Sequence, residues 1–178
     1  MTSERNYFDL FGLPVSYQVD PEALEAAYER LSLETHPDFL TNAPPEEQRQ
    51  ALRLSADVNE GYRVLRDRSE RAAYLLRLLA GETKLDTTAL PDGFLQEMFM
   101  LQEELDEIGE TAENNTGADN GLAEGMRQQV EARITAVESE QEALFAMVSD
   151  KPGIELLQTI QTNLNCTKYL QRLMERMG

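Results

Sequence analysis

The sequence predicts an all-α protein built from two helical domains. Apolar residues recur at helical spacing along most of the 178 residues, and no segment alternates between apolar and polar residues as a strand would. Residues typical of helix ends recur along the chain. An Asp or Asn precedes an apolar run, and a Gly or Pro follows it. Because 41% of the residues are hydrophobic, such helices can bury a packed core.

The N-terminal domain should contain two short helices, one at its beginning and one at its end. Asn6 can cap a helix that ends at Phe11, and Gly12 can adopt the left-handed conformation that terminates it. A later helix is expected over residues 69–79, with Gly81 placed to end it. The apolar side of this later helix consists of Ala72, Leu75, Leu76 and Leu79.

Between these two, a pair of longer helices should form an antiparallel hairpin. Asp20 and Pro21 begin the first, because an aspartate side chain accepts a free amide and proline lacks one. It should end just before Pro37, and Pro45 should begin the second helix. The short connection therefore displays His36-Pro37-Asp38 at the hairpin tip. The apolar stripes are Leu24, Ala27, Tyr28 and Leu31 in the first helix and Leu54, Val58, Tyr62 and Leu65 in the second.

A polar, turn-prone stretch over residues 81–88 divides the chain. We predict an N-terminal domain of residues 1–80, a linker of residues 81–90 and a C-terminal domain of residues 91–178. Residues 1–80 carry nine basic and 14 acidic side chains, whereas residues 81–178 carry seven and 19. The C-terminal part is therefore much the more acidic.

Three helices are expected in the C-terminal domain, and three such helices form a natural bundle. The first runs from about Phe94 to Ile108, and the polar residues 113–121 should form a loop. The third starts near Pro152. Apolar positions in the second and third helices are Met126, Val130, Ile134, Val137, Leu144 and Phe145, and Ile154, Leu157, Ile160, Leu164, Leu170 and Leu173.

The helix of residues 94–108 has two different apolar sides. One is a core-facing seam at helical spacing, formed by Phe94, Met98, Leu101, Leu105 and Ile108. Leu95, Phe99 and Met100 point away from that seam, on the side that also carries Gln96, Glu103 and Glu107. An apolar patch rimmed by carboxylates is typical of a partner-binding surface. The alternatives are packing against the N-terminal domain, or exposed apolar residues without a role.

Charge and cysteine content limit the class of protein. Sixteen basic against 33 acidic residues give a net charge of −17, which would repel nucleic acid and anionic membranes. No apolar run reaches membrane-spanning length, and the N-terminus lacks the features of a secretory signal. The lone Cys166 cannot form an internal disulfide. We therefore expect a cytoplasmic protein that binds neither nucleic acid nor membrane.

Catalysis and bound cofactors have little support. One histidine and one cysteine cannot build the common zinc sites or a thiolate cluster site. The acidic residues within 103–107 lack the loop geometry of a calcium site and fit a solvated helix face. We find no nucleophile paired with a base and no phosphate-binding glycine loop. We expect neither enzyme activity nor a metal or other cofactor.

Several segments match the motifs of one known family. They are Tyr7 to Pro14, the tip His36-Pro37-Asp38, Asn59, Arg71 to Leu76, and Phe94-Leu95 followed by residues 103–108. Together they resemble J-domain proteins of the HscB type, which are co-chaperones in iron-sulfur cluster assembly. The tip motif is general to J-domains, whereas the Leu-Phe-Gly-Leu-Pro start and the Tyr-Leu-Leu segment point to this subgroup. The resemblance extends over nearly the whole chain.

The resemblance implies a J-domain followed by a three-helix bundle, with one binding surface on each. The tip would stimulate ATP hydrolysis by a DnaK-type chaperone, here the specialised HscA type, with Arg30, Arg63 and Arg66 as basic contacts. The bundle would hold the iron-sulfur cluster scaffold protein. Scaffold contacts are expected at Leu95, Gln96, Phe99, Met100, Glu103, Glu107 and Leu156.

The chain departs from the family's pattern in several places. J-domains commonly present a basic face on the second helix and a lysine after the tip, but here Phe39 follows the tip and Arg30 is the helix's only basic residue. Gln96 stands where methionine is usual, and Met100 where an acidic residue is usual. Electrostatic steering toward the chaperone should therefore be weak. Arginines later in the chain either supply the missing positive charge or merely solubilise an exposed face. These are Arg49, Arg53, Arg63, Arg66, Arg68 and Arg71.

Other function classes remain open from the sequence. A purely structural helical interaction protein would not need the His36-Pro37-Asp38 tip, whereas a co-chaperone would. A J-domain protein could also serve a different client, without a role in iron-sulfur assembly. A metal-dependent hydrolase that uses the acidic residues is the weakest alternative.

Overall fold

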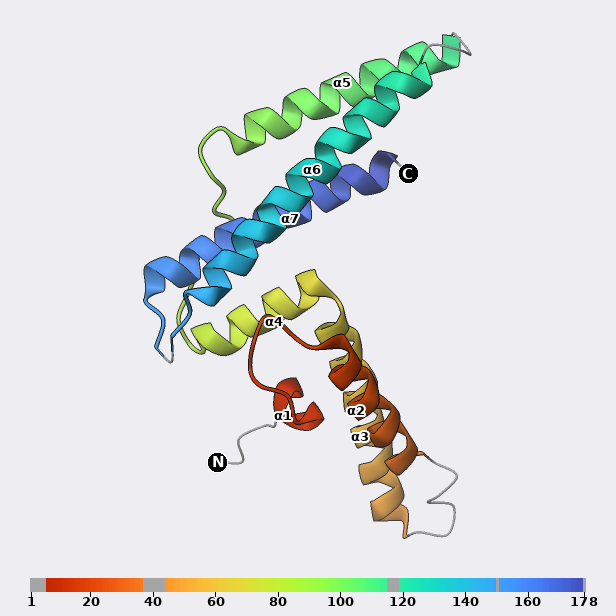
Figure 1. Cartoon of the computed structure of the whole chain (residues 1–178), viewed down its shortest axis with the longest axis vertical. Coiled ribbons are helices and arrows are strands. Elements are labelled where there is room, and N and C mark those ends of the chain that lie inside the picture. The colour runs from red at the N-terminus through yellow and green to blue at the C-terminus, as the bar shows by residue number, and fades with distance from the viewer. Residues whose placement is uncertain (1–5, 37–43, 115–118, 150, 178) are drawn as a thin grey trace. The chain divides into compact units, whose positions relative to one another are not determined.

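The structure is a computed structural model that describes residues 6–36, 44–114, 119–149 and 151–177, without the side chains of residues 108–114, 119, 120 and 122. The described residues form seven helices and no strand, so the all-α prediction is confirmed (Figure 1). The chain divides into two compact units, Met1–Leu78 and Leu79–Gly178.

The first unit contains the predicted hairpin and its flanking helices. Asn6 accepts a hydrogen bond from the Asp9 amide (2.9 Å), and Gly12 takes a φ of 69°, so the ends of the first helix are as predicted. The Asp20 carboxylate likewise accepts from the Glu22 amide (3.0 Å). The helices are α1 (Tyr7–Phe11), α2 (Pro21–Glu34), α3 (Pro45–Arg66) and α4 (Arg68–Ala80).

The short helix α1 packs against α3 at Gly61. A Cβ atom at Gly61 would lie 2.9 Å from Cε2 of Phe11 and 3.0 Å from Cδ1 of Tyr7, so only glycine allows this close approach. The Tyr7 ring in turn stacks on Tyr74 of α4 (centroids 4.7 Å apart), and the Tyr7 amide donates to the Tyr74 hydroxyl (2.8 Å). These contacts join α1, α3 and α4 around one core.

One apolar residue of α3 is not where we predicted it. Leu54 was expected on the buried face, but it is 38% exposed and lines an open groove with Leu10 and Leu78. The five-residue helix α1 packs closely on α3 at Gly61, about two turns further along. Leu54 therefore lies at the surface of this groove together with Leu10 of α1.

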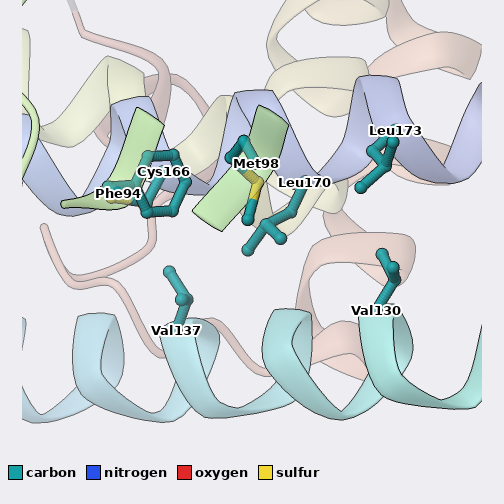
Figure 2. Close-up of a cluster of buried hydrophobic side chains, with 7 residues drawn as sticks. All are labelled: Phe94, Met98, Val130, Val137, Cys166, Leu170 and Leu173. Atoms are coloured by element: carbon teal, nitrogen blue, oxygen red, sulfur yellow. The ribbon is translucent and has the colours of Figure 1, made fainter. Parts of the chain in front are cut away.

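The second unit is a three-helix bundle of α5 (Phe94–Asn114), α6 (Asp119–Ala146) and α7 (Ile154–Met177). Figure 2 shows side chains from α5 and α7 meeting Val130 and Val137 of α6. Leu101 and Leu105 of the α5 seam pack against this core but remain partly exposed. Burial raises the pKa of the Cys166 thiol, which agrees with a packing role for that residue. The core residues are Phe94, Met98, Val130, Val137, Cys166, Leu170 and Leu173.

The predicted loop of residues 113–121 is wrong in its extent. Helix α5 continues past Ile108 to Asn114, and α6 already begins at Asp119. Gly109 does not end the helix, since a glycine in a helix interior costs only about 1 kcal/mol relative to alanine. The good helix formers after it, Glu110, Ala112 and Glu113, favour continuation.

The segment before α5 is attached to α7 by side-chain hydrogen bonds. The Asp86 amide donates to Gln158 (2.8 Å), Gln158 donates back to the Asp86 carbonyl (3.0 Å), and Asn165 donates to the Ala89 carbonyl (2.8 Å). Hydrogen bonds from the Thr88 hydroxyl and amide lower the pKa of the Asp86 carboxyl. Side chains of α7 thus fix the backbone of the segment that leads into α5.

Candidate functional sites

The first candidate site is the end of α2, where the chain turns toward α3. Thr35 is buried, and both its amide (3.0 Å) and its hydroxyl (2.9 Å) donate to the Leu31 carbonyl. The amide of the exposed His36 donates to the Leu33 carbonyl (3.3 Å). His36 therefore directly follows a residue, Thr35, that hydrogen bonds fix to the end of α2. Pro37 and Asp38 lie outside the described residues.

A polar and aromatic contact joins α2 and α3 on the exposed side of the hairpin. The rings of Tyr28 and Tyr62 stack with centroids 4.1 Å apart, and the Tyr28 hydroxyl donates to Asn59 (3.0 Å). The Tyr62 hydroxyl donates to the Glu25 carboxylate, and this hydrogen bond raises the pKa of Tyr62. The sequence singled out Asn59 as a family motif, but only the structure gives it a partner across the hairpin.

The three candidate basic contacts do not gather at the tip. Arg30 pairs with Glu34 (3.4 Å) in the last turns of α2, close to His36 in the chain. Tyr62, next to Arg63, lies level with Glu25, which is about 16 Å from His36 along the axis of α2. Arg63 and Arg66 therefore lie toward the opposite end of the hairpin from His36.

Neighbouring carboxylates and a tyrosine ring also interact with Arg63 and Arg66. Arg63 donates to Glu60 (2.7 Å) and to Glu70, which raises the pKa of Arg63 and lowers that of Glu60. The Arg66 guanidinium lies 5.8 Å from the centroid of the Tyr62 ring. All of these pairs are exposed, so each contributes little to stability, but together they reduce the free positive charge of the unit.

Arg71 has a different role from the other arginines. It is only 7% exposed, donates to the Leu65 carbonyl (2.5 Å) and lies 5.5 Å from the centroid of the Tyr17 ring. Burial lowers the pKa of its guanidinium. Arg71 thus stabilises the corner between α3 and α4. The expectation that it supplies surface charge or solubility is wrong.

The second candidate site is the outer side of α5. Leu95, Phe99 and Met100 are 57%, 62% and 61% exposed, and we call these three residues the α5 patch. Gln96, Glu103 and Glu107 are also exposed. The seam residues Phe94 and Met98 are buried on the opposite side, so the structure has the two apolar sides of this helix that the spacing predicts.

Ion pairs mark the two flanks of α5. Glu97 pairs with Arg133 of α6 (3.4 Å) on one flank, and Asp106 pairs with Arg176 of α7 (3.1 Å) on the other. Phe99, Met100 and the acidic rim lie between these flanks on the side remote from the core, and Leu95 lies on the flank of Asp106. Such a surface offers apolar contact area with carboxylates around it.

Leu156 does not share this surface. It is partly buried near the start of α7, whereas the first residue of α5, Phe94, meets α7 at Tyr169 with ring centroids 6.0 Å apart. Leu156 and Tyr169 are separated by about 20 Å along the helix axis. The sequence analysis did not name Tyr169 as a residue that packs against α5, because periodicity does not show which residue of α7 meets that helix.

Other kinds of site have no support in the described part of the chain. Among the residues that the structure describes, no three His, Cys, Asp or Glu side chains gather as a metal site would require. None of the described helices has the length and apolar character needed to span a bilayer.

Comparisons with known proteins place both units in one family. A family model described as the DnaJ domain matches residues 6–74. The co-chaperone protein HscB homolog of Azoarcus sp. (strain BH72) is 41% identical over 105 residues, which span 58% of this chain and 59% of that protein. The homolog of Bordetella petrii is 35% identical over 134 residues, which span 75% of this chain and 79% of that protein.

Solved structures extend the similarity to nearly the full chain. The chaperone HscB from Vibrio cholerae has a TM-score of 0.78 at 25% identity, covering 97% of this chain and 95% of that one. Human co-chaperone protein HscB has a TM-score of 0.80 at 22% identity, with 99% and 82% covered, and shows the shared fold.

These findings agree with the site geometry, because the J-domain region contains the exposed His36 and the remaining residues form the helical C-terminal region. A J-domain co-chaperone works with a chaperone of the Hsp70 type, so such a partner is implied. The chain belongs to the HscB family of J-domain co-chaperones.

Proposed function

We propose that this co-chaperone stimulates the ATPase of an HscA/DnaK-type chaperone through His36-Pro37-Asp38 and presents an iron-sulfur cluster scaffold protein through the outer side of α5. The observation that carries the proposal is the placement of an exposed His36 and an exposed apolar patch on two separate compact units. One chain can then bind two proteins at once. In this proposal the chain itself is not an enzyme, since ATP hydrolysis occurs on the chaperone.

The hairpin supports the proposed role of the tip. His36 follows a helix end that is closed by hydrogen bonds to Leu31, and the Tyr28–Tyr62 stack couples α2 to α3. Proline at position 37 limits the conformations that must be frozen when a partner binds. An anchored histidine beside a proline is suited to a short, specific contact.

The proposed scaffold contacts are those of the α5 patch with Gln96, Glu103 and Glu107. Large exposed side chains such as Leu95 and Phe99 can supply the apolar anchors of an interface, and a carboxylate rim can orient a basic partner. Gln96 and Met100, which depart from the family's pattern, would give this interface its own set of contacts.

The ATPase activity of a purified HscA-type chaperone tests the first half of the proposal. His36→Gln should remove the stimulation and leave the midpoint of thermal unfolding nearly unchanged, because exposed residues contribute little to stability. Lys84→Gln, a change at another exposed residue outside the J-domain region, is the control and should stimulate normally. Full stimulation by His36→Gln would refute a role for the tip.

Calorimetric titration with the scaffold protein tests the second half. The wild type and His36→Gln should bind it equally, because the tip and the α5 patch lie on different units. A chain that stimulates the chaperone but does not bind the scaffold would instead be a J-domain protein for a different client.

A further inference from the structure

Among the described residues 32–36, at the end of α2, Thr35 alone is buried. Its side chain is 4% exposed, whereas Leu33 is 64% exposed and His36 is exposed as well. Thr35 therefore fixes the end of the helix to the interior of the hairpin. A change in the direction of the backbone at this residue would have to move a packed side chain.

The Thr35 hydroxyl adds a second hydrogen bond at the point where the helix ends. Both the amide (3.0 Å) and the hydroxyl (2.9 Å) donate to the carbonyl of the buried Leu31. The next amide, that of His36, bonds only three residues back, to Leu33 (3.3 Å), and Pro37 has no N–H to donate. Among the described residues, Thr35 is thus the last that bonds four residues back along α2.

Other threonine hydroxyls make the same kind of bond inside helices. Thr135 and Thr159 donate to the carbonyl four residues back at 2.9 Å, and the buried Thr167 does so at 3.2 Å. These three residues lie within α6 or α7, where backbone hydrogen bonds hold the chain on either side. A helix end lacks such bonds and opens at little cost. The same hydroxyl bond therefore influences the backbone more at Thr35 than at Thr167.

We propose that Thr35 is a positioning residue, whose buried hydroxyl holds His36 in the orientation that the chaperone binds. This inference rests on the proposed function, in which His36 belongs to the contact that stimulates the chaperone. Thr35 is buried and does not itself touch the chaperone. It acts by keeping the end of α2 closed, so that a larger fraction of the molecules presents His36 ready for binding.

This role predicts a specific change in the kinetics of stimulation. A chaperone that binds only the closed form has an apparent affinity reduced in proportion to the fraction of closed molecules. Once bound, the chaperone holds His36 in the same place whether or not the hydroxyl is present. Loss of the hydroxyl should therefore raise the co-chaperone concentration that gives half-maximal stimulation and leave the maximal ATPase rate unchanged.

Titration of the full chain into a purified HscA-type chaperone, with the ATPase rate as the readout, tests the inference. Thr35→Val keeps the size of the side chain but removes the hydroxyl, and it should raise the half-maximal concentration about threefold. Thr35→Ser keeps the hydroxyl and should behave like the wild type. Thr35→Ala also lacks the hydroxyl, so it should resemble Thr35→Val and replaces it if that variant does not fold. Circular dichroism at the assay temperature measures the folded fraction of each variant.

The matched control is Thr167→Val, which removes the same kind of bond from a buried position in the other unit. It should stimulate like the wild type, even if it lowers the midpoint of thermal unfolding as much as Thr35→Val does. His36 is the only histidine of the chain, so its ring gives one set of NMR signals. These signals should move in Thr35→Val and stay in place in Thr35→Ser and Thr167→Val.

Three results would overturn this inference and keep the proposed function, provided that His36→Gln is inactive. The first is a folded Thr35→Val that stimulates at the wild-type concentration. The second is a folded Thr35→Ser that is as impaired as Thr35→Val, because the methyl group and not the hydroxyl would then matter. The third is a lower maximal rate at an unchanged half-maximal concentration, because Thr35 would then act in the bound complex. Full stimulation by His36→Gln would instead refute the proposed role of the tip.

Discussion

In the α2–α3 hairpin the candidate contact His36 stands just beyond the end of a helix, whereas in the bundle Leu95 and Phe99 lie within a helix whose other side forms the core. The hairpin is joined by ring stacking and side-chain hydrogen bonds at residues away from the tip. In α5, by contrast, an exposed residue of the candidate interface directly follows one that faces the core. Function and stability are thus separated along the chain in the first unit and around one helix in the second.

This difference teaches how each site tolerates change. A substitution at His36 meets few packing neighbours, because the residue is exposed. On α5, Met98 is 8% exposed and the next residue, Phe99, is 62% exposed. A single step along that helix therefore moves a substitution from the core to the candidate interface.

The largest expected effect tests the two sides of α5. Met98→Ala should lower the free energy of unfolding by about 2–5 kcal/mol, because it removes buried apolar volume and leaves a cavity. Met100→Ala is the matched control and should change it by less than about 0.5 kcal/mol, since Met100 is exposed. Urea denaturation measures both, and equal losses would show that the assignment of sides is wrong.

A comparable test applies to the packing of the first unit. Gly61→Ala should lower the free energy of unfolding by about 1–3 kcal/mol, since its Cβ would press on Phe11 and Tyr7. The control, Gly125→Ala in α6, has no atom within 4 Å of its Cβ and should be neutral or stabilising. Thermal unfolding compares the two, and a neutral Gly61→Ala would mean that α1 is not packed closely on α3.

The candidate interface itself should respond in binding and not in stability. Leu95→Ala and Phe99→Ala should each weaken scaffold binding by about 1–3 kcal/mol if these side chains are anchors. Leu33→Ala, an exposed leucine of α2, should have no effect on that binding. Calorimetry together with thermal unfolding decides, because a loss of stability with intact binding would reverse the assigned roles.

The smallest effects concern charge and should differ between the two units. Association with the scaffold should slow as salt rises, because screening shortens the reach of Glu103 and Glu107. Chaperone stimulation should depend less on salt, since Arg30 and Arg63 already pair within the chain.

Variants of the arginines sharpen this expectation. Arg30→Ala should cost about 0.2–1 kcal/mol in chaperone binding, whereas the double variant Arg63→Ala plus Arg66→Ala should cost less, because those residues lie farther from His36. ATPase stimulation at increasing salt measures both. A dominant loss in the double variant would show that the far end of the hairpin docks on the chaperone.

The sequence by itself determined the features that depend on near neighbours in the chain. Helix ends at Asn6, Gly12, Asp20 and Pro45 follow from capping groups and missing amides within one turn, and all lie where the residues predict. The core seam of α5 follows from apolar spacing alone, as the burial of Phe94 and Met98 confirms. Short segments of the sequence were also enough to identify the tip motif and the resemblance to the family.

Only the tertiary structure decided the features that depend on which helices meet. Leu54 lies at the surface of a groove and not in the core, and Arg71 is buried because the corner between α3 and α4 closes over it. Which residue of α7 meets Phe94 depends on how α5 and α7 are aligned, and it is Tyr169, about 20 Å from Leu156. Periodicity gives the side of one helix on which a residue lies, but only the packing of neighbouring helices decides what covers that side.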